Sequence, residues 1–274
     1  MSWWGKTIGG AFGFLLGGPI GVVIGAALGH TFDKGLDKLS LSEGARGGAS
    51  SQERVQAIFF TTTFSVLGHL AKVDGRVTRD EIQMVEAVMG HLSLTPEQRS
   101  VAVNLFSEGK KAGFPLEGLL AQFKRECLGR RNLVRMLMEI LLFAAYADGV
   151  LHEQERFLLL HICKQLGFSS SEFKKLEAFV KAANSFNEWS ASSGEQRRDQ
   201  ASPAASLADD YALLQVDVEA SNDEIKRAYR RLMNQHHPDK LVAKGLPEEM
   251  IKLATENTYK IRAAYDRIRA KRAF

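Results

Sequence analysis

Residues 223–240 read DEIKRAYRRLMNQHHPDK, and this stretch decides how the C-terminal part of the chain folds. Its apolar positions recur every three or four residues, which predicts an amphipathic α-helix. Ser221 and Glu224 form a capping box at the start of this helix. Pro238 cannot continue a helix and disfavours the helical conformation at His237, so the helix is expected to end in a turn there. The apolar face consists of Ile225, Ala228, Tyr229 and Leu232.

Four basic side chains lie on another face of this helix. Lys226 and Arg230 are four residues apart, as are Arg227 and Arg231. Like charges at this spacing cost about 0.2–0.5 kcal/mol per pair. Because folding gains nothing from such a cluster, we infer an acidic partner. A solvated basic face is the alternative; nucleic-acid binding is possible but not expected.

A final helix is predicted from about Pro247, because apolar residues again recur at a spacing of three to four. Two antiparallel helices would then project the turn and the basic face toward one side. A short helix is expected around residues 211–216. A catalytic or zinc-binding role for His236 and His237 is not favoured, because neither has cysteine partners and adjacent histidines point apart on a helix.

The pattern IKRAYRRL followed by HHPDK resembles the J domain, the module with which DnaJ-type co-chaperones stimulate Hsp70. The resemblance covers about residues 209–274. It implies that His237, Pro238 and Asp239 are required to activate the Hsp70 ATPase. It also implies that four basic residues dock on an acidic Hsp70 surface, namely Lys226, Arg227, Arg230 and Arg231.

The chain departs from the usual J domain in two places. Gln215 stands where the family usually has glycine, and the loop LVAKGLPEEM at 241–250 is longer than usual. The chain also has no CxxCxGxG repeats and no long Gly/Phe tract, so the usual client-binding parts of a J protein are missing. We therefore expect the middle of the chain to choose the client or the location.

The N-terminal segment from Thr7 to Gly29 contains no charged residue and holds eight of the chain's 24 glycines. At about 1.5 Å per residue it would reach about 34 Å, enough to cross a hydrocarbon core of about 30 Å. We therefore predict a transmembrane helix at 7–29, with Trp3 and Trp4 at the interface and a kink or lost hydrogen bond at Pro19. A cleaved signal peptide is the rival interpretation.

Six glycines of this segment repeat every four residues, which places them along one slowly drifting stripe. Such a stripe lets a second helix approach closely and predicts a homodimer. A weakly hydrophobic anchor without self-association is one alternative; a glycine-lined pore is another, although the segment offers almost no polar lining. The six glycines are Gly9, Gly13, Gly17, Gly21, Gly25 and Gly29.

Positive charge follows the predicted span rather than precedes it. Only Lys6 comes before the span, so the positive-inside rule places a short N-terminus in the periplasm and the bulk of the chain in the cytoplasm. Cys127 and Cys163 are too few for a disulfide framework or a cysteine-rich zinc site, and they are compatible with a reducing compartment. The basic residues after the span are Lys34, Lys38, Arg46 and Arg54.

Two segments of the middle region, at 71–81 and 145–155, share the pattern Ala-x-x-Asp-Gly-x-[Val/Leu]-x-x-x-Glu. Each follows an apolar helical pattern and precedes another. One interpretation is a pair of capped helix corners, in which Gly75 and Gly149 adopt the left-handed conformation. Facing repeats could instead bring four carboxylates together around a hard cation, namely Asp74, Glu81, Asp148 and Glu155.

These repeats resemble the TerB-like helical domain, over roughly residues 55–183. The family's acidic positions correspond to the four carboxylates, but its function is poorly defined, so the resemblance implies a fold more than an activity. Helical periodicity runs from Gln52 to about Ala183, and Thr95 followed by Pro96 predicts a helix start. No alternating strand pattern competes with it.

The whole chain has 274 residues, a net charge of +4, 45% hydrophobic and 25% charged residues. These values exclude a disordered chain, a polytopic membrane protein and a collagen-like fibre. We predict an all-α protein of six parts: a periplasmic N-terminus at 1–6, a transmembrane helix at 7–29, a juxtamembrane linker at 30–51, a TerB-like domain at 52–183, a flexible linker at 184–208 and a J domain at 209–274.

This order of parts resembles the membrane-anchored J proteins of Gram-negative bacteria. The resemblance implies an inner-membrane co-chaperone for the cytoplasmic Hsp70, DnaK, that dimerises through its span and is linked to envelope stress signalling and capsule synthesis. It would not itself be an enzyme and would need no cofactor. A metal-sensing membrane adaptor, with the four carboxylates as its sensor, is the alternative function.

Overall fold

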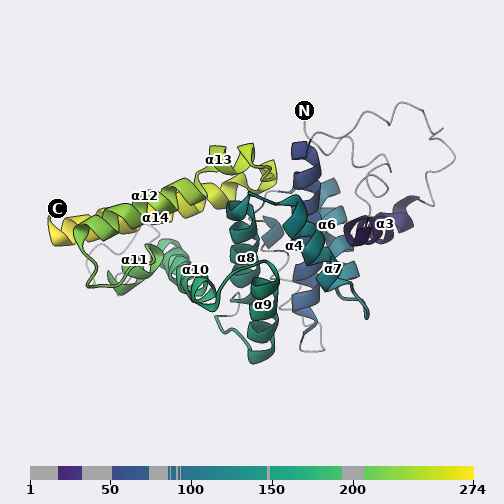
Figure 1. Cartoon of the computed structure of the whole chain (residues 1–274), viewed down its shortest axis with the longest axis horizontal. Coiled ribbons are helices and arrows are strands. Elements are labelled where there is room, and N and C mark those ends of the chain that lie inside the picture. Colours follow the sequence, from purple (N-terminus) through teal and green to yellow (C-terminus); the bar gives the residue numbers. More distant parts are fainter. Residues whose placement is uncertain are drawn as a thin grey trace.

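The computed structural model describes residues 18–32, 51–73, 86, 88–90, 92, 94–146, 149–192 and 207–274. Within these residues the regular structure is helical and no strand is present, which confirms the all-α fold class (Figure 1). The helices are α3 (Gly18–Phe32), α4 (Ser51–Ala71), α6 (Pro96–Gly109), α7 (Leu116–Glu126), α8 (Arg131–Ala145), α9 (Glu153–Gln165), α10 (Ser170–Ser192), α11 (Leu207–Leu213), α12 (Asn222–His236), α13 (Pro238–Ala243), the 3-10 turn η3 (Glu248–Met250) and α14 (Ile251–Arg272).

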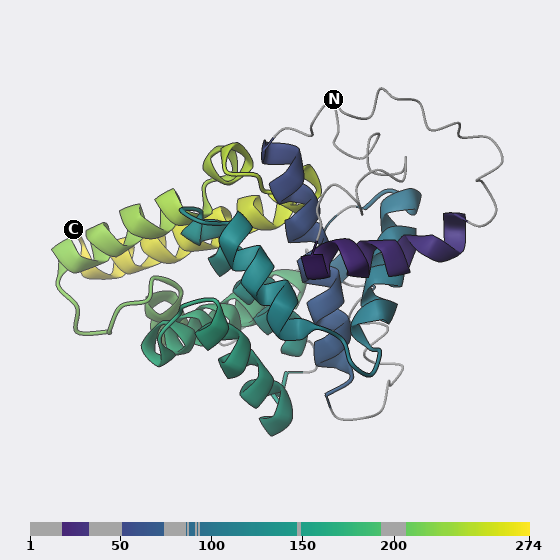
Figure 2. The ribbon, with the colours of Figure 1, turned by 45° about the vertical axis from the view of Figure 1, so that its right-hand side comes forward.

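Helix α4 is the centre of the middle domain and is buried almost all round. It contacts α3, α6, α7 and α8, which surround it in Figure 2. Phe59, Phe60 and Phe64 on this helix are at most 1% exposed. The sequence pattern predicts one apolar face that includes Phe59, whereas the structure also buries Phe60 and Phe64. A helix enclosed by neighbours is apolar on every side, so periodicity alone understates its burial.

Helices α4 and α6 cross at two glycines. A Cβ atom added at Gly68 would lie 1.9 Å from the carbonyl oxygen of Phe106, and one added at Gly109 would lie 1.9 Å from that of Ser65. The two backbones are therefore in direct contact, which only a residue without a side chain permits. Neither glycine stands out in the sequence, because each is a single residue within a helix.

The predicted helix start at Thr95 is confirmed. The Thr95 hydroxyl accepts a hydrogen bond from the backbone N–H of Gln98 at 3.3 Å, and the Gln98 side chain accepts one from the Thr95 N–H at 2.8 Å. Pro96 occupies the first turn of α6, where its missing N–H costs nothing. The left-handed conformation expected at Gly149 is confirmed as well, with φ of 86°.

A buried carboxylate joins three helices of the middle domain. Glu177 on α10 accepts hydrogen bonds from the Tyr146 hydroxyl at 2.6 Å and from both terminal nitrogens of Arg156 at 2.6 and 3.1 Å. Burial alone would raise the pKa of Glu177, but these hydrogen bonds outweigh it and lower the pKa below its ordinary value. Glu177 is therefore a satisfied buried charge that connects the end of α8 with α9 and α10.

Helix α3 holds the C-terminal half of the predicted membrane segment and packs on the middle domain. It lies against α6 and α7 (Figure 2). The N–H of Ile20 donates to the Gln122 side chain at 2.9 Å. Within the described residues Pro19 lies in the first turn of α3, a position that needs no N–H donor. The effect of Pro19 on the whole predicted span stays a prediction, because residues 7–17 lie outside the described residues. The side chains of α3 that are buried are Ile20, Val23, Ile24 and Ala27.

The predicted span at 7–29 is described only from Gly18 onward, and α3 continues past its expected end to Phe32. Among the residues that the structure describes, no helix has both the length and the apolar character needed to cross a bilayer.

The C-terminal domain is an antiparallel pair of long helices, α12 and α14, which lie side by side in both ribbon views (Figures 1 and 2). The rings of Tyr229 and Tyr265 stack between them with centroids 4.2 Å apart. Helix α11 lies against α14, where the Arg267 guanidinium donates to the buried carboxylate of Asp210 at 2.9 Å. This confirms the predicted hairpin.

Four features differ from those predicted. Helix α10 continues to Ser192 and so occupies the first part of the segment expected to be a linker, while α11 already begins at Leu207. Residues 238–243, expected as the end of the turn and the start of the loop at 241–250, form α13, because Pro238 suits the first turn of a new helix. The last helix begins at Ile251 after the 3-10 turn, a few residues later than predicted.

Candidate functional site

The candidate site is the turn at the end of α12. Its helix begins as predicted, with the Ser221 N–H donating to Glu224 at 2.8 Å. It ends at His236, and His237 takes the extended conformation with φ of −59° and ψ of 121°. Pro238 then begins α13, and the Leu241 N–H donates to the His237 carbonyl at 3.1 Å. The turn predicted from Pro238 is therefore confirmed as a sharp break between two helices.

The turn presents a carboxylate to solvent. Asp239 is exposed, whereas His237 and Pro238 are half-buried. The exposed Lys240 donates from Nζ to the side chain of Asn234, which connects α13 back to α12. Backbone and side-chain hydrogen bonds thus hold the turn in one conformation, a condition for a recognition element that loses little entropy on binding.

The basic side chains line α12 up to this turn. Arg227, Arg230 and Arg231 are exposed, and Arg230 donates from Nε to the Lys226 carbonyl at 3.3 Å. Lys226 is half-buried, with its ammonium 5.1 Å from the centre of the Phe274 ring. The structure therefore brings the cationic residues and the turn together on one helix, as predicted.

Arg231 differs from the other three arginine and lysine side chains of this face. Burial, together with the positive charge of Arg135 on α8, lowers the pKa of Arg231. This end of the basic face is therefore exposed but lies near Arg135 of the middle domain.

The two cysteines offer no reactive thiolate. Both are free and buried. Burial raises the pKa of Cys127 to about 12 and that of Cys163 to about 11, so both thiols are protonated at neutral pH. A protonated thiol is a poor nucleophile and a poor metal ligand.

The carboxylate metal site stays a prediction. Asp74, Glu81 and Asp148 lie outside the described residues. The Glu155 carboxylate accepts a hydrogen bond from the backbone N–H of His152 at 3.0 Å, so it caps α9, as the structural interpretation expects. Within the described ranges, no three His, Cys, Asp or Glu side chains are grouped to hold a metal ion.

The glycine repeat is described in part. Gly9, Gly13 and Gly17 lie outside the described residues, and Gly29 lies in α3. Gly21 is buried, whereas Gly25 is exposed and a Cβ atom there would enter open space. The described part of the stripe is thus divided between the face of α3 that packs on the middle domain and its outer face.

A buried polar cluster that the sequence pattern does not predict lies beside the turn. Glu139 on α8, His236 at the end of α12, and Asn257 and Lys260 on α14 are each at most 5% exposed. One signal was available: Glu139 is the only acidic residue in the run RNLVRMLMEILLFAA. A buried acid within an apolar helix calls for a partner, but the sequence does not say which.

The chain matches three family models in succession. These are the co-chaperone DjlA transmembrane domain at residues 1–39, the tellurite resistance protein TerB at 61–178 and the DnaJ domain at 209–272. It is 44% identical to the co-chaperone protein DjlA of Photobacterium profundum over 99% of both chains, and 43% identical to that of Vibrio parahaemolyticus over the full length of both. The chain belongs to the DjlA family of co-chaperones. No solved structure is significantly similar to it.

The chain is also 39% identical to the DjlA of Yersinia pestis over the full length of both chains. These matches agree with the resemblances that the Asp-Gly repeats and the His-Pro-Asp turn indicate. The protein is therefore a membrane-anchored, J-domain co-chaperone with a TerB-like middle domain. A J domain fits a regulator of Hsp70 better than an enzyme with its own substrate.

Proposed function

We propose that this protein stimulates the ATPase of the cytoplasmic Hsp70, DnaK, at the inner membrane. The observation that carries the proposal is the geometry of one helix: α12 bears exposed Arg227 and Arg230 and ends in a turn that presents Asp239. An acidic surface of Hsp70 would dock on the cationic residues, including Lys226 and Arg231. Such complementarity raises the association rate and orients the partner.

In this proposal His237, Pro238 and Asp239 trigger ATP hydrolysis in the partner. Pro238 sets the break between α12 and α13, and the exposed Asp239 carboxylate is free to accept hydrogen bonds or pair with a cation on Hsp70. The hydrolysing groups belong to Hsp70, and this chain supplies the contact that favours their active arrangement.

The ATPase rate of DnaK with the full chain in detergent micelles tests this function. We expect the wild type to stimulate hydrolysis, His237→Gln to abolish the stimulation, and Arg230→Glu to weaken it at least tenfold through a change of two charges at a docking contact. Asp266→Asn on α14, whose carboxylate is 60% exposed, is a matched surface control and is expected to behave as wild type. Equal rates with wild type and His237→Gln would contradict the proposal.

Two further parts of the proposal concern the membrane. The glycine repeat pairs two spans, and the charges after residue 29 keep the J domain in the cytoplasm with residues 1–6 in the periplasm. Crosslinking in native membranes tests the pairing, and a purely monomeric chain would oppose it. Protease protection of the C-terminus in inside-out vesicles would contradict the orientation.

The proposed consequence for the cell is Hsp70 recruitment to clients that act in envelope stress signalling and capsule synthesis. Deletion of the gene, complemented by wild type or by His237→Gln, tests this link. Unchanged envelope stress signalling and capsule amounts after deletion would argue against it.

A further inference from the structure

The turn is held on both sides by the middle domain. On its C-terminal side, the side chain of Gln52 at the start of α4 donates to the Val242 carbonyl at 3.0 Å, and that of Gln56 donates to the Leu246 carbonyl at 3.4 Å. On its N-terminal side, His236 is 1% exposed and its ring stacks on Phe179 of α10 with centroids 5.2 Å apart. The residues that flank His-Pro-Asp are therefore both fixed to α4 and α10.

The centre of this contact is a carboxyl group that faces a histidine. Glu139 Oε1 lies 3.5 Å from His236 Nε2, and the Asn257 side chain donates to Glu139 Oε2 at 3.4 Å. Burial raises the pKa of Glu139 to about 8, against the opposing effect of Arg135. Burial and Arg135 together lower the pKa of His236 to about 3. At neutral pH both groups are uncharged, so this is not an ion pair.

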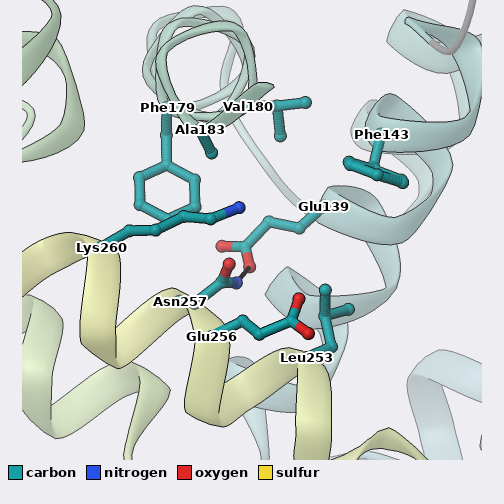
Figure 3. Close-up of a pocket in the computed structure, with 9 residues that line it drawn as sticks. All are labelled: Glu139, Phe143, Phe179, Val180, Ala183, Leu253, Glu256, Asn257 and Lys260. Carbon is teal, nitrogen blue, oxygen red and sulfur yellow. Dashed lines mark hydrogen bonds between the residues drawn. The ribbon is translucent and has the colours of Figure 1, made fainter. Parts of the chain in front are cut away.

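Figure 3 shows how the J domain reaches this carboxyl group. Asn257 and Lys260 extend from α14 toward Glu139, while Phe179 and Val180 come from α10. Burial lowers the pKa of Lys260 to about 8, despite the opposing charge of Glu256. The cavity among these side chains has a volume of about 30 Å³, which holds water but no organic ligand. Its polar groups therefore serve the contact between the two domains.

The contact between the two domains contains polar atoms and like charges that oppose docking. Glu139 Oε1 and both ring nitrogens of His236 are buried without a hydrogen bond. A buried polar group that has neither a protein partner nor a water costs about 1–3 kcal/mol, so separation of the domains, which solvates these atoms, meets less resistance than at a fully hydrogen-bonded contact. Arg135 and Arg231 add like charges on opposite sides of the contact.

We propose that the middle domain is a docking partner for its own J domain and restrains it, so that separation of the two raises Hsp70 stimulation. The restraint rests on the function proposed above. Hsp70 bound over the basic face and the turn would contact α8 beside Arg231, where Arg135 lies. Docking also immobilises both flanks of the turn, so Hsp70 can engage it fully only after Gln52, Gln56 and Glu139 have released the J domain.

Lys260→Glu in the full chain tests this restraint. The substitution removes the ammonium group beside Glu256 and buries a carboxyl without a cationic partner next to Glu139, which is costly at a buried contact. We expect hydrogen exchange of residues 241–250 to accelerate about tenfold without Hsp70, and stimulation of DnaK by subsaturating co-chaperone to rise about tenfold. Lys271→Glu is the matched control, since it makes the same charge change at an exposed position of α14 and should leave both quantities unchanged.

Arg135→Glu provides a test of opposite sign, because it turns the repulsion from Arg231 into attraction. We expect slower exchange of residues 241–250 and about threefold weaker stimulation, the effect of a modest ion pair. Circular dichroism of both variants verifies that the helices are intact.

The readouts separate the two proposals. Exchange at wild-type rates in Lys260→Glu would show that the domains are not docked in solution. Faster exchange with unchanged stimulation would overturn the restraint while leaving the docking in place. Absence of DnaK stimulation by every variant, wild type included, would remove the proposed function and the restraint with it, and the exchange rates would then judge the docking alone.

Discussion

The α4–α6 crossing inside the middle domain and the α8–α14 contact between domains are built from different groups. At the first, Gly68 and Gly109 bring two backbones together without side chains. At the second, Glu139 and His236 leave polar atoms buried without hydrogen bonds. Close-packed backbones lose contacts on any displacement, whereas unsatisfied polar groups gain water when they separate.

This difference indicates which contact we expect to open more readily. In the middle domain the buried charge at Glu177 is hydrogen-bonded to Tyr146 and Arg156, and the central helices α4 and α6 touch directly. The J domain contacts the middle domain partly through polar groups that lack protein partners. Regions that open at low free-energy cost are the ones proteins use for regulation.

Gly68→Ala should break the first contact and have the largest effect on stability. The new methyl group would lie 1.9 Å from the Phe106 carbonyl oxygen, so α4 and α6 must move apart. We expect a loss of about 3 kcal/mol in the free energy of unfolding, measured with urea. Gly90→Ala is the control: its methyl group enters open space, so the stability should hold or rise by about 0.5 kcal/mol. A small loss of stability in Gly68→Ala would mean that α4 and α6 are not in direct backbone contact at this crossing.

Arg156→Gln should damage the satisfied network around Glu177 in the middle domain. Glu177 would keep its burial but lose its bidentate partner, and we expect a loss of about 2 kcal/mol at pH 7. The pKa of Glu177 is lowered in the folded state, so its stabilisation is complete above the unfolded value near 4.5 and is lost as the pH falls. Wild type and variant should therefore converge in acid.

The control for this network is Arg131→Gln, which removes a surface ion pair with Glu172. Surface pairs contribute about 0–1 kcal/mol, so this variant should lose much less stability. Equal losses of stability in the two variants would show that the buried Arg156–Glu177 pair stabilises the fold no more than a surface ion pair does.

The inter-domain contact should weaken as the pH rises from 6.5 to 8. Docking keeps a proton on Glu139 that the undocked carboxyl releases above about 4.5, so docking is lost as the pH rises toward 8. Between about 3 and 6.5, His236 contributes with the opposite sign, because only the undocked ring is protonated there. Above pH 8 the trend reverses, because Lys260 is neutral in the docked form and takes up a proton when the domains separate.

Between pH 6.5 and 8, the effect of Glu139 on the docking free energy is not offset by His236 or Lys260. Glu256, Arg135 and Arg231 also face the contact. We expect the docking free energy to fall by at most about 1.4 kcal/mol per pH unit. Protection factors of residues 241–250, which correct for the intrinsic exchange rate, measure it. Glu139→Gln cannot titrate and should show no slope in this range; an equal slope would assign the effect to another group.

Gln215→Gly should have the smallest effect and leaves both contacts intact. Gln215 lies just after the end of α11 at Leu213 and has φ of 55°, a conformation that costs a residue with a side chain about 1 kcal/mol. We expect glycine to stabilise the J domain by about 1 kcal/mol relative to Gln215→Ala, measured by thermal unfolding. Equal melting temperatures of the two variants would contradict this reading of the backbone.

Local sequence determined the helices and the turn of this protein. The capping boxes at Ser221 and Thr95, the break at Pro238 and the left-handed Gly149 each depend on residues within about four positions of one another. Hydrogen bonds of helix ends and the fixed φ of proline act over this range. The hairpin follows too, because the apolar faces of α12 and α14 are close in sequence and can be buried against each other.

Tertiary structure alone decided the contacts between distant residues. Glu139 meets Asn257 across 118 positions and Gln56 meets Leu246 across 190, and no periodicity carries such pairings. The same holds for Gly68 and Gly109, whose role depends on how two helices cross. Sequence patterns show which side chains leave water, whereas the partner of a buried polar group is set by the packing of whole helices.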